Sequence, residues 1–154
     1  MDATMEATTE ETRDNAPLES MGSTFWRIVF QIDAPPPNVV GLDLRSASII
    51  GHTGSPLDEM PDLDLKCYGT AVNGISRRHA VLLPDKDAVY LIDLSSTNGT
   101  WVNGRFLVPG NKHLLQREDV IEFGHLKMIV RLVQNVDVTY DQGFDTTVTR
   151  PKPR

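Results

Sequence analysis

Apolar residues in this chain come in short runs or alternate with polar residues, and turn-forming residues separate the runs. A period of two places successive side chains on opposite faces of a β-strand, whereas a helix face needs a period of 3.6. The best helical candidate, residues 112–118, is too short for several turns. The pattern therefore predicts an all-β domain, built as an antiparallel sandwich or barrel.

We expect about ten strands, each bounded by turn residues such as Gly, Pro, Asn or Asp. They lie at residues 25–32, 39–44, 48–50, 63–65, 79–83, 88–94, 101–102, 106–108, 120–123 and 126–133. Asn103-Gly104, between two of these strands, suits the positive φ angles of a type I′ hairpin turn.

The two ends of the chain differ in composition from its middle. Residues 1–22 are acidic and rich in threonine, and residues 136–154 end in two prolines among basic residues. Such segments bury too little apolar surface to offset the entropy lost on ordering. We therefore predict disordered tails at 1–22 and 136–154 around a single domain at 23–135.

Composition disfavours several classes of function. The chain holds 15 Lys and Arg against 21 Asp and Glu, a formal net charge of -6, whereas nucleic acids and anionic membranes attract a surplus of cations. The one cysteine, Cys67, has no partner for a disulfide, and the four histidines lack the spacing of a zinc site. We therefore expect no metal, no cofactor, and no nucleic-acid or membrane partner. Without a signal pattern or a long apolar run, we expect a cytoplasmic protein.

Two polar segments stand at the ends of expected strands. Ser76-Arg77-Arg78-His79 precedes one strand, and residues 95–100 follow the next strand along the chain. Their hydroxyl, guanidinium, amide and Gly-permitted backbone N–H groups suit a compact oxyanion such as phosphate. Turn formation alone explains either segment taken singly. A hydrolase built from Ser76, His79 and Asp93 lacks the G-x-S-x-G motif, so we favour binding and predict no enzyme.

Together these segments resemble the forkhead-associated (FHA) domain. The resemblance covers roughly residues 25–133 and rests on Gly51, Ser76-Arg77-Arg78-His79, the run from Asp93 to Gly104, and residues 119–124. The residues Ser76-Arg77-Arg78-His79-Ala80 are similar to the corresponding segment of bacterial members in Ser/Thr-kinase signalling. The resemblance implies a β-sandwich of about eleven strands whose loops at one end bind phosphothreonine peptides.

The resemblance also implies a role for individual residues. Ser76 would hydrogen-bond the phosphate, Thr97 would add a second contact, and Asn98 would hold the peptide backbone. Arg77 stands where family members place a polar phosphate or peptide contact. Three further residues would shape the loops without touching the ligand: Gly51, His79 and Gly99.

One position departs from the family pattern. The family usually has Gly-Arg where this chain has Gly51-His52, and arginine is always charged and binds phosphate bidentately. An isolated imidazole, with a reference pKa of about 6.5, is mostly neutral at pH 7, although a bound phosphate would favour its charged form. We therefore keep His52 among the binding residues. The alternative is a scaffold or oligomerisation domain with weakened or lost phosphate binding. Such a domain would pair through an apolar face, to which Trp101 and Phe106 could contribute if they were exposed. For both of these side chains we expect burial in the core.

Threonines in both tails suggest regulation by phosphorylation, at Thr8, Thr9, Thr12, Thr146, Thr147 or Thr149. A phosphorylated tail would bind its own domain, or that of a neighbour, because tethering supplies a millimolar effective concentration. Plain linker composition is the alternative. The expected partners are thus phosphothreonine-containing proteins, among them a Ser/Thr kinase or its substrates.

Overall fold

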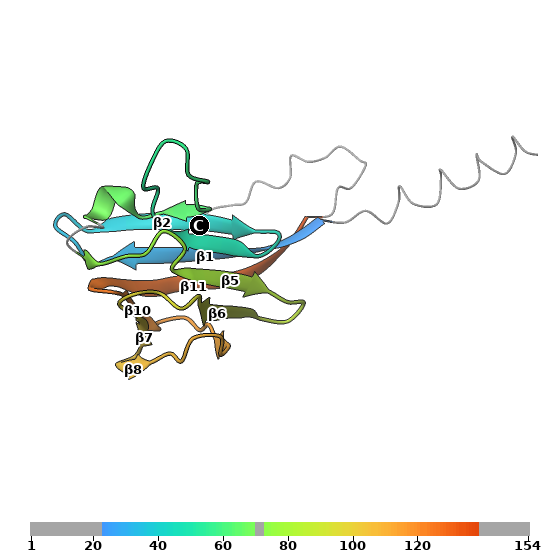
Figure 1. Cartoon of the computed structure of the whole chain (residues 1–154). Coiled ribbons are helices and arrows are strands. Elements are labelled where there is room, and N and C mark those ends of the chain that lie inside the picture. The colour runs from blue at the N-terminus through green and yellow to red at the C-terminus, as the bar shows by residue number, and fades with distance from the viewer. Residues whose placement is uncertain (1–22, 70–72, 139–154) are drawn as a thin grey trace, which may run out of the picture. The chain divides into compact units, whose positions relative to one another are not determined.

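Two β-sheets make up the domain in a computed structural model that describes residues 23–69 and 73–138 (Figure 1). The described residues contain eleven strands and a short 3-10 turn, η1, at Lys66–Tyr68. The strands are β1 (Ser23–Ile32), β2 (Asn38–Leu44), β3 (Ser48–Gly51), β4 (Leu63–Asp64), β5 (Ala80–Pro84), β6 (Val89–Asp93), β7 (Thr100–Val102), β8 (Arg105–Phe106), β9 (His113–Leu114), β10 (Val120–Phe123) and β11 (Leu126–Val138).

The sheets combine distant parts of the chain. One sheet has the order β2-β1-β11-β10-β7-β8 and the other the order β4-β3-β5-β6-β9. Figure 1 shows β11 in orange-red beside β1 in blue, so the first and last strands are neighbours. Residues 25–136 form one compact unit. The prediction of an all-β sandwich of about eleven strands is confirmed, and the Asn103-Gly104 turn has the expected positive φ angles of 52° and 82°.

The core follows from the alternation seen in the sequence. In β6, Val89, Leu91 and Asp93 are buried, while Tyr90 and Ile92, which alternate with them, are half-buried. The inner faces of both sheets supply fully buried side chains, including Ile28, Phe30, Ile50, Leu82, Leu91, Ile121, Phe123 and Met128. Each buried side chain of this size contributes about 1.5–3 kcal/mol relative to an exposed one, so this core makes a rigid base for the loops.

Strand pairing brings three chain segments to one end of the second sheet. Ile50 of β3 pairs with Ala80 of β5, and Ala80 pairs with Asp93 of β6, all antiparallel. The end of β3, the start of β5 and the end of β6 therefore coincide. The segments that extend from these points are residues 73–79 and 94–99, which we call the paired loops, and residues 52–62, which we call the 52–62 loop.

Two details differ from expectation, and a third lies outside what the described residues test. Residues 112–118, the best helical candidate, contain strand β9, because His113 and Leu114 pair with β6. Trp101 and Phe106 are 37% and 48% exposed, so the expectation of core burial was wrong. Trp101 points outward between buried Thr100 and Val102, and Phe106 lies opposite it on exposed strand β8. The predicted tails lie almost wholly outside the described residues, and the boundaries at 23 and 135 stay a prediction. Among the described residues, no helix is long and apolar enough to cross a membrane.

Candidate functional site

Ser76 and Thr97 meet across the paired loops. The Thr97 N–H donates to Ser76 Oγ at 3.0 Å. Because the hydroxyl oxygen of Ser76 accepts this bond, its own proton remains able to donate to a further group. Ser76 is half-buried and Thr97 exposed. The structure thus brings these two predicted site residues together at the solvent edge of the sheet.

Asn98 makes a second link between the same loops. Its Nδ2 donates to the Gly74 carbonyl at 2.9 Å. A side chain at Gly74 would collide with this amide, so glycine permits the link. The Asn98 carbonyl oxygen and its second N–H remain able to bond elsewhere. An exposed amide of this kind can hold the backbone of an extended peptide.

His79 fixes the paired loops from below. Its ring is fully buried and packs edge-on against Phe123, with centroids 5.5 Å apart. Nδ1 accepts the backbone N–H of Ser76 at 3.0 Å, so Nε2 carries the proton and donates to the Gly99 carbonyl at 2.9 Å. Burial lowers the pKa of His79 and keeps the ring neutral. His79 therefore braces the loops, as the family resemblance implied.

The same contacts argue against a hydrolytic triad at this place. His79 bonds to the backbone of Ser76 and not to its hydroxyl, which a general base would have to deprotonate. Asp93 Oδ1 stands 4.0 Å from His79 Nε2, beyond hydrogen-bond range. The arrangement is suited to holding loops in place.

Asp93 organises the second of the paired loops. Its buried carboxylate accepts the Ser96 hydroxyl at 2.6 Å, the Ser96 N–H at 3.0 Å and the Thr100 hydroxyl at 2.7 Å. Ser96 Oγ in turn accepts the Gly99 N–H at 3.1 Å. This network holds the backbone of residues 94–99 so that Thr97 and Asn98, which point outward, have fixed positions. Neither Asp93 nor Ser96 was among the predicted site residues, although the Asp-x-x-Ser spacing is a capping-type signal.

Two loop glycines have identifiable steric reasons. A Cβ at Gly51 would overlap the Arg77 carbonyl, so only glycine lets the end of β3 approach the first paired loop. Gly99 has a φ of 86°, and Phe106 and Trp101 pack over it. Both positions fit the structural role that the resemblance implied.

His52 and Arg77 lie beside this cluster but are held differently. The His52 N–H donates to the Arg77 carbonyl at 3.3 Å, which places their backbones side by side. The ring Nδ1 of His52 is buried and has no hydrogen-bond partner among the described residues. Arg77 Nη1 stands 3.5 Å from Asp58 Oδ2 in the 52–62 loop. Sequence reasoning missed Asp58, because nothing in its local sequence indicates this contact.

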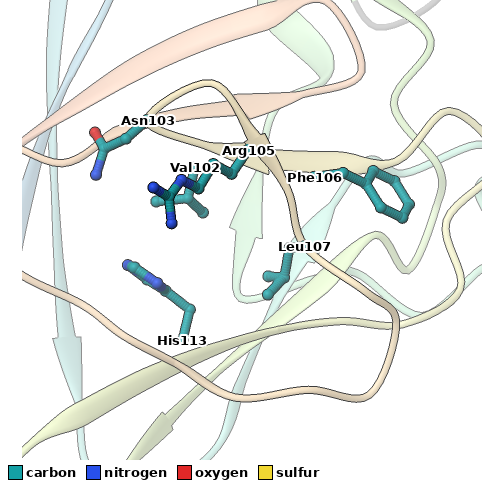
Figure 2. A pocket seen from close by; sticks show the side chains of 6 residues that line it. All are labelled: Val102, Asn103, Arg105, Phe106, Leu107 and His113. Atoms are coloured by element: carbon teal, nitrogen blue, oxygen red, sulfur yellow. The ribbon is translucent and has the colours of Figure 1, made fainter.

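A separate hollow of about 500 Å³ lies at the β7–β8 hairpin and β9, lined by Val102, Asn103, Arg105, Phe106, Leu107 and His113. Figure 2 shows Asn103, Arg105 and His113 gathered on one side of it, with Leu107 and Phe106 on the other. His113 Nε2 is bonded to Asp119 Oδ2 at 2.9 Å. Burial raises the pKa of the Asp119 carboxyl, but the hydrogen bonds that it accepts from His113, Asn103 and the Gln116 N–H together outweigh burial and hold that pKa below its usual value. None of the predicted site residues lines this hollow.

Among residues 23–69 and 73–138, no group of three or more His, Cys, Asp or Glu side chains is arranged to hold a metal ion.

Known proteins are similar to this chain in sequence. A model of the FHA domain matches residues 54–124. The oxoglutarate dehydrogenase inhibitor of Corynebacterium jeikeium is 31% identical over an alignment of 112 positions, which covers 64% of this chain and 74% of that protein. FhaA of Mycobacterium tuberculosis is 44% identical over 88 residues, 57% of this chain, and FraH of Nostoc sp. is 36% identical over 84 residues, 54% of this chain. The chain spans only 14% of the length of FhaA and 29% of that of FraH.

Solved structures agree with the sequence comparisons. A domain from a study of phosphothreonine-dependent FHA domain interactions is 32% identical, with a TM-score of 0.51 over 69% of this chain and 96% of that one. The FHA domain of FhaA, solved in complex with the intracellular domain of Rv3910, is 31% identical, with a TM-score of 0.52 over 68% of this chain and 99% of that one. The chain therefore belongs to the forkhead-associated family, whose domains are phosphothreonine-binding modules of signalling.

Proposed function

We propose that this chain binds phosphothreonine peptides through Ser76, Thr97 and Asn98, with positive charge supplied by Arg77 and His52. The observation that carries the proposal is the 3.0 Å bond from the Thr97 N–H to Ser76 Oγ. It unites the two loops that the family resemblance assigns to phosphate and peptide. The hydroxyl proton of Ser76 and the amide of Asn98 then face a ligand as donors.

The partner on this proposal is a phosphorylated protein in Ser/Thr-kinase signalling. The FHA domain of FhaA has been solved with the intracellular domain of another protein, which supports a protein segment as the ligand of this related domain. The recognised chemistry is a phosphothreonine in an extended peptide, since the Ser76 hydroxyl suits a phosphate oxygen and the exposed Asn98 amide suits a peptide backbone.

Paired peptides test the proposal. Titration calorimetry with phosphothreonine peptides selected from an array, and with their unphosphorylated copies, should show binding of the phosphorylated form only. Ser76→Ala should weaken it by about 10- to 150-fold, because charge-assisted hydrogen bonds contribute about 1.5–3 kcal/mol each. Ser46→Ala, at an exposed serine outside the paired loops, is the matched control and should bind as the wild type does. Equal binding of phosphorylated and unphosphorylated peptides would contradict the proposal.

Regulation through the tails extends the proposal. Phosphorylation of Thr8, Thr9 or Thr12, or of Thr146, Thr147 or Thr149, would supply a tethered ligand for the domain's own site. Kinase treatment followed by mass spectrometry identifies the modified threonine. The phosphorylated chain should then bind external phosphopeptide more weakly than a chain without tails, whereas unchanged affinity would contradict autoinhibition.

A scaffold or oligomerisation role is the second candidate, favoured by the exposure of Trp101 and Phe106. The two rings stack edge-on, with centroids 5.2 Å apart, and Val108 nearby in sequence is 52% exposed. Light scattering should show an oligomer that Trp101→Ala dissociates if this face pairs copies of the chain. A monomer at all concentrations would remove this candidate.

A further inference from the structure

Arg77 directly follows Ser76, yet its side chain is directed to the 52–62 loop. Its Nη1 stands 3.5 Å from Asp58 Oδ2. Gly54 makes room for this path, because a Cβ there would lie 2.6 Å from Arg77 Nε. The guanidinium group therefore lies over the backbone of Gly54 and against a carboxylate of its own chain.

This ion pair is loose. The separation of 3.5 Å exceeds the 2.7–2.9 Å of a charge-assisted N–H···O bond, and Asp58 Oδ2 accepts no hydrogen bond among the described residues. The Arg77 side chain is 64% exposed, whereas that of Asp58 is 27% exposed and its Oδ2 is buried. A pair with one exposed partner and no hydrogen bond is weaker than a buried, hydrogen-bonded pair. The exposed guanidinium group of Arg77 can therefore exchange Asp58 for a stronger anion.

Other charged groups surround the pair without taking its place. A hollow of about 220 Å³ beside the pair is lined by Glu59, Asp62, Arg77 and Arg78, among other residues. Asp62 Oδ2 is occupied by the Ile49 N–H at 2.8 Å. Glu59 is exposed and forms no ion pair in the described part of the chain. Asp58 is thus the carboxylate that engages Arg77.

We propose that Asp58 acts as an internal competitor for Arg77 and so sets the affinity of the site for phosphate. The inference rests on the proposed phosphothreonine binding and deepens it. A phosphate ester carries up to two negative charges and accepts a bidentate guanidinium, so it displaces the single carboxylate. The displaced Asp58 then repels the ligand, because both are anions. Weakly charged ligands fail to displace it, which sharpens discrimination in favour of the phosphorylated peptide.

Charge removal at Asp58 tests the inference. Asp58→Asn keeps the shape of the side chain and should tighten phosphopeptide binding by about two- to fivefold, the range that an exposed ion pair of up to about 1 kcal/mol allows. Glu59→Gln removes the same charge one residue away and should change affinity less. In an Arg77→Ala background, Asp58→Asn should give no more gain than Glu59→Gln does.

The possible outcomes separate this inference from the proposed function. Weaker binding by Asp58→Asn would show that the pair organises the site, and would overturn the inference. An equal gain in Glu59→Gln, or a full gain that persists without Arg77, would reduce the effect to general charge and overturn it as well. If the wild-type chain binds phosphorylated and unphosphorylated peptides equally, the proposed function itself is overturned. This comparison is made before any variant is measured.

Discussion

The paired loops and the 52–62 loop border the same strand ends but differ in how they are held. Ser76, Thr97 and Asn98 belong to loops joined by hydrogen bonds of 2.9–3.0 Å and braced from below by buried His79. The 52–62 loop is anchored near its ends, where Thr53 bonds to Asp64 at 2.6 Å and Asp62 bonds to Ile49. Between these anchors its contact with Arg77 is a loose ion pair.

The difference separates two tasks. Hydrogen-bond geometry requires atoms held within a few tenths of an ångström, and the braced loops supply this for their donors. Charge acts over longer distances and tolerates movement, so Arg77 and His52 do not need the same rigidity. On the proposed function, Ser76, Thr97 and Asn98 are thus the fixed part of the site, and Arg77 and His52 are its adjustable part.

Removal of the brace should have the largest effect. His79→Ala leaves the Ser76 N–H and the Gly99 carbonyl without their partner, at a cost of about 1–3 kcal/mol for each buried group, and it also opens a cavity beside Phe123. We expect the free energy of unfolding to fall by roughly 2–6 kcal/mol, measured by urea denaturation. A loss below that of a typical surface substitution, such as Ser46→Ala, would show that the loops do not depend on His79.

The pH dependence of the free energy of unfolding should reveal the contribution of His79, with a moderate effect. The folded-state pKa of His79 is lowered by burial, so its contribution is complete above the unfolded value of about 6.5 and is lost as pH falls through the folded value. Below pH 6.5 the free energy of unfolding should decrease by up to about 1.4 kcal/mol per pH unit from this one group.

Nuclear magnetic resonance separates His79 from the other histidines in that pH range. Its ring signals should still show the neutral Nε2–H form as the pH falls below 6.5, because the folded state resists protonation. Titration of His79 near its ordinary value would contradict the brace as described, since a charged ring cannot accept the Ser76 N–H.

A substitution at His52 should have the smallest of the expected effects. His52→Arg restores the usual family residue and adds a permanent charge, so phosphopeptide binding should tighten by up to about fivefold. Calorimetry with one phosphopeptide measures both affinities. Equal affinities of the two proteins would remove His52 from the site.

Much of the site could be predicted because it lies at strand ends. Ser76 precedes β5 and Thr97 follows β6, so antiparallel pairing of two neighbouring strands is enough to bring them together. Asp58 could not be predicted in this way. It lies within a long loop, and the path of such a loop depends on side-chain contacts that have no period in the sequence.

Local signals also failed where burial depends on the partner sheet. Trp101 and Phe106 are large apolar residues of the kind that usually fill a core. In their hairpin, however, both side chains lie on the exposed face, opposite to the face of buried Val102. Strand β9 has only two residues, His113 and Leu114, so no alternating pattern could reveal it in the sequence. It is recognised in the structure by its pairing with β6.

The sequence by itself determined the all-β class, the turns and the polar segments at the strand ends, because backbone alternation and turn chemistry act over a few residues. Only the tertiary structure decided that buried His79 joins two loops and that Asp58 engages Arg77. Those contacts join residues that are distant in sequence, and their geometry exists only when both sheets have packed.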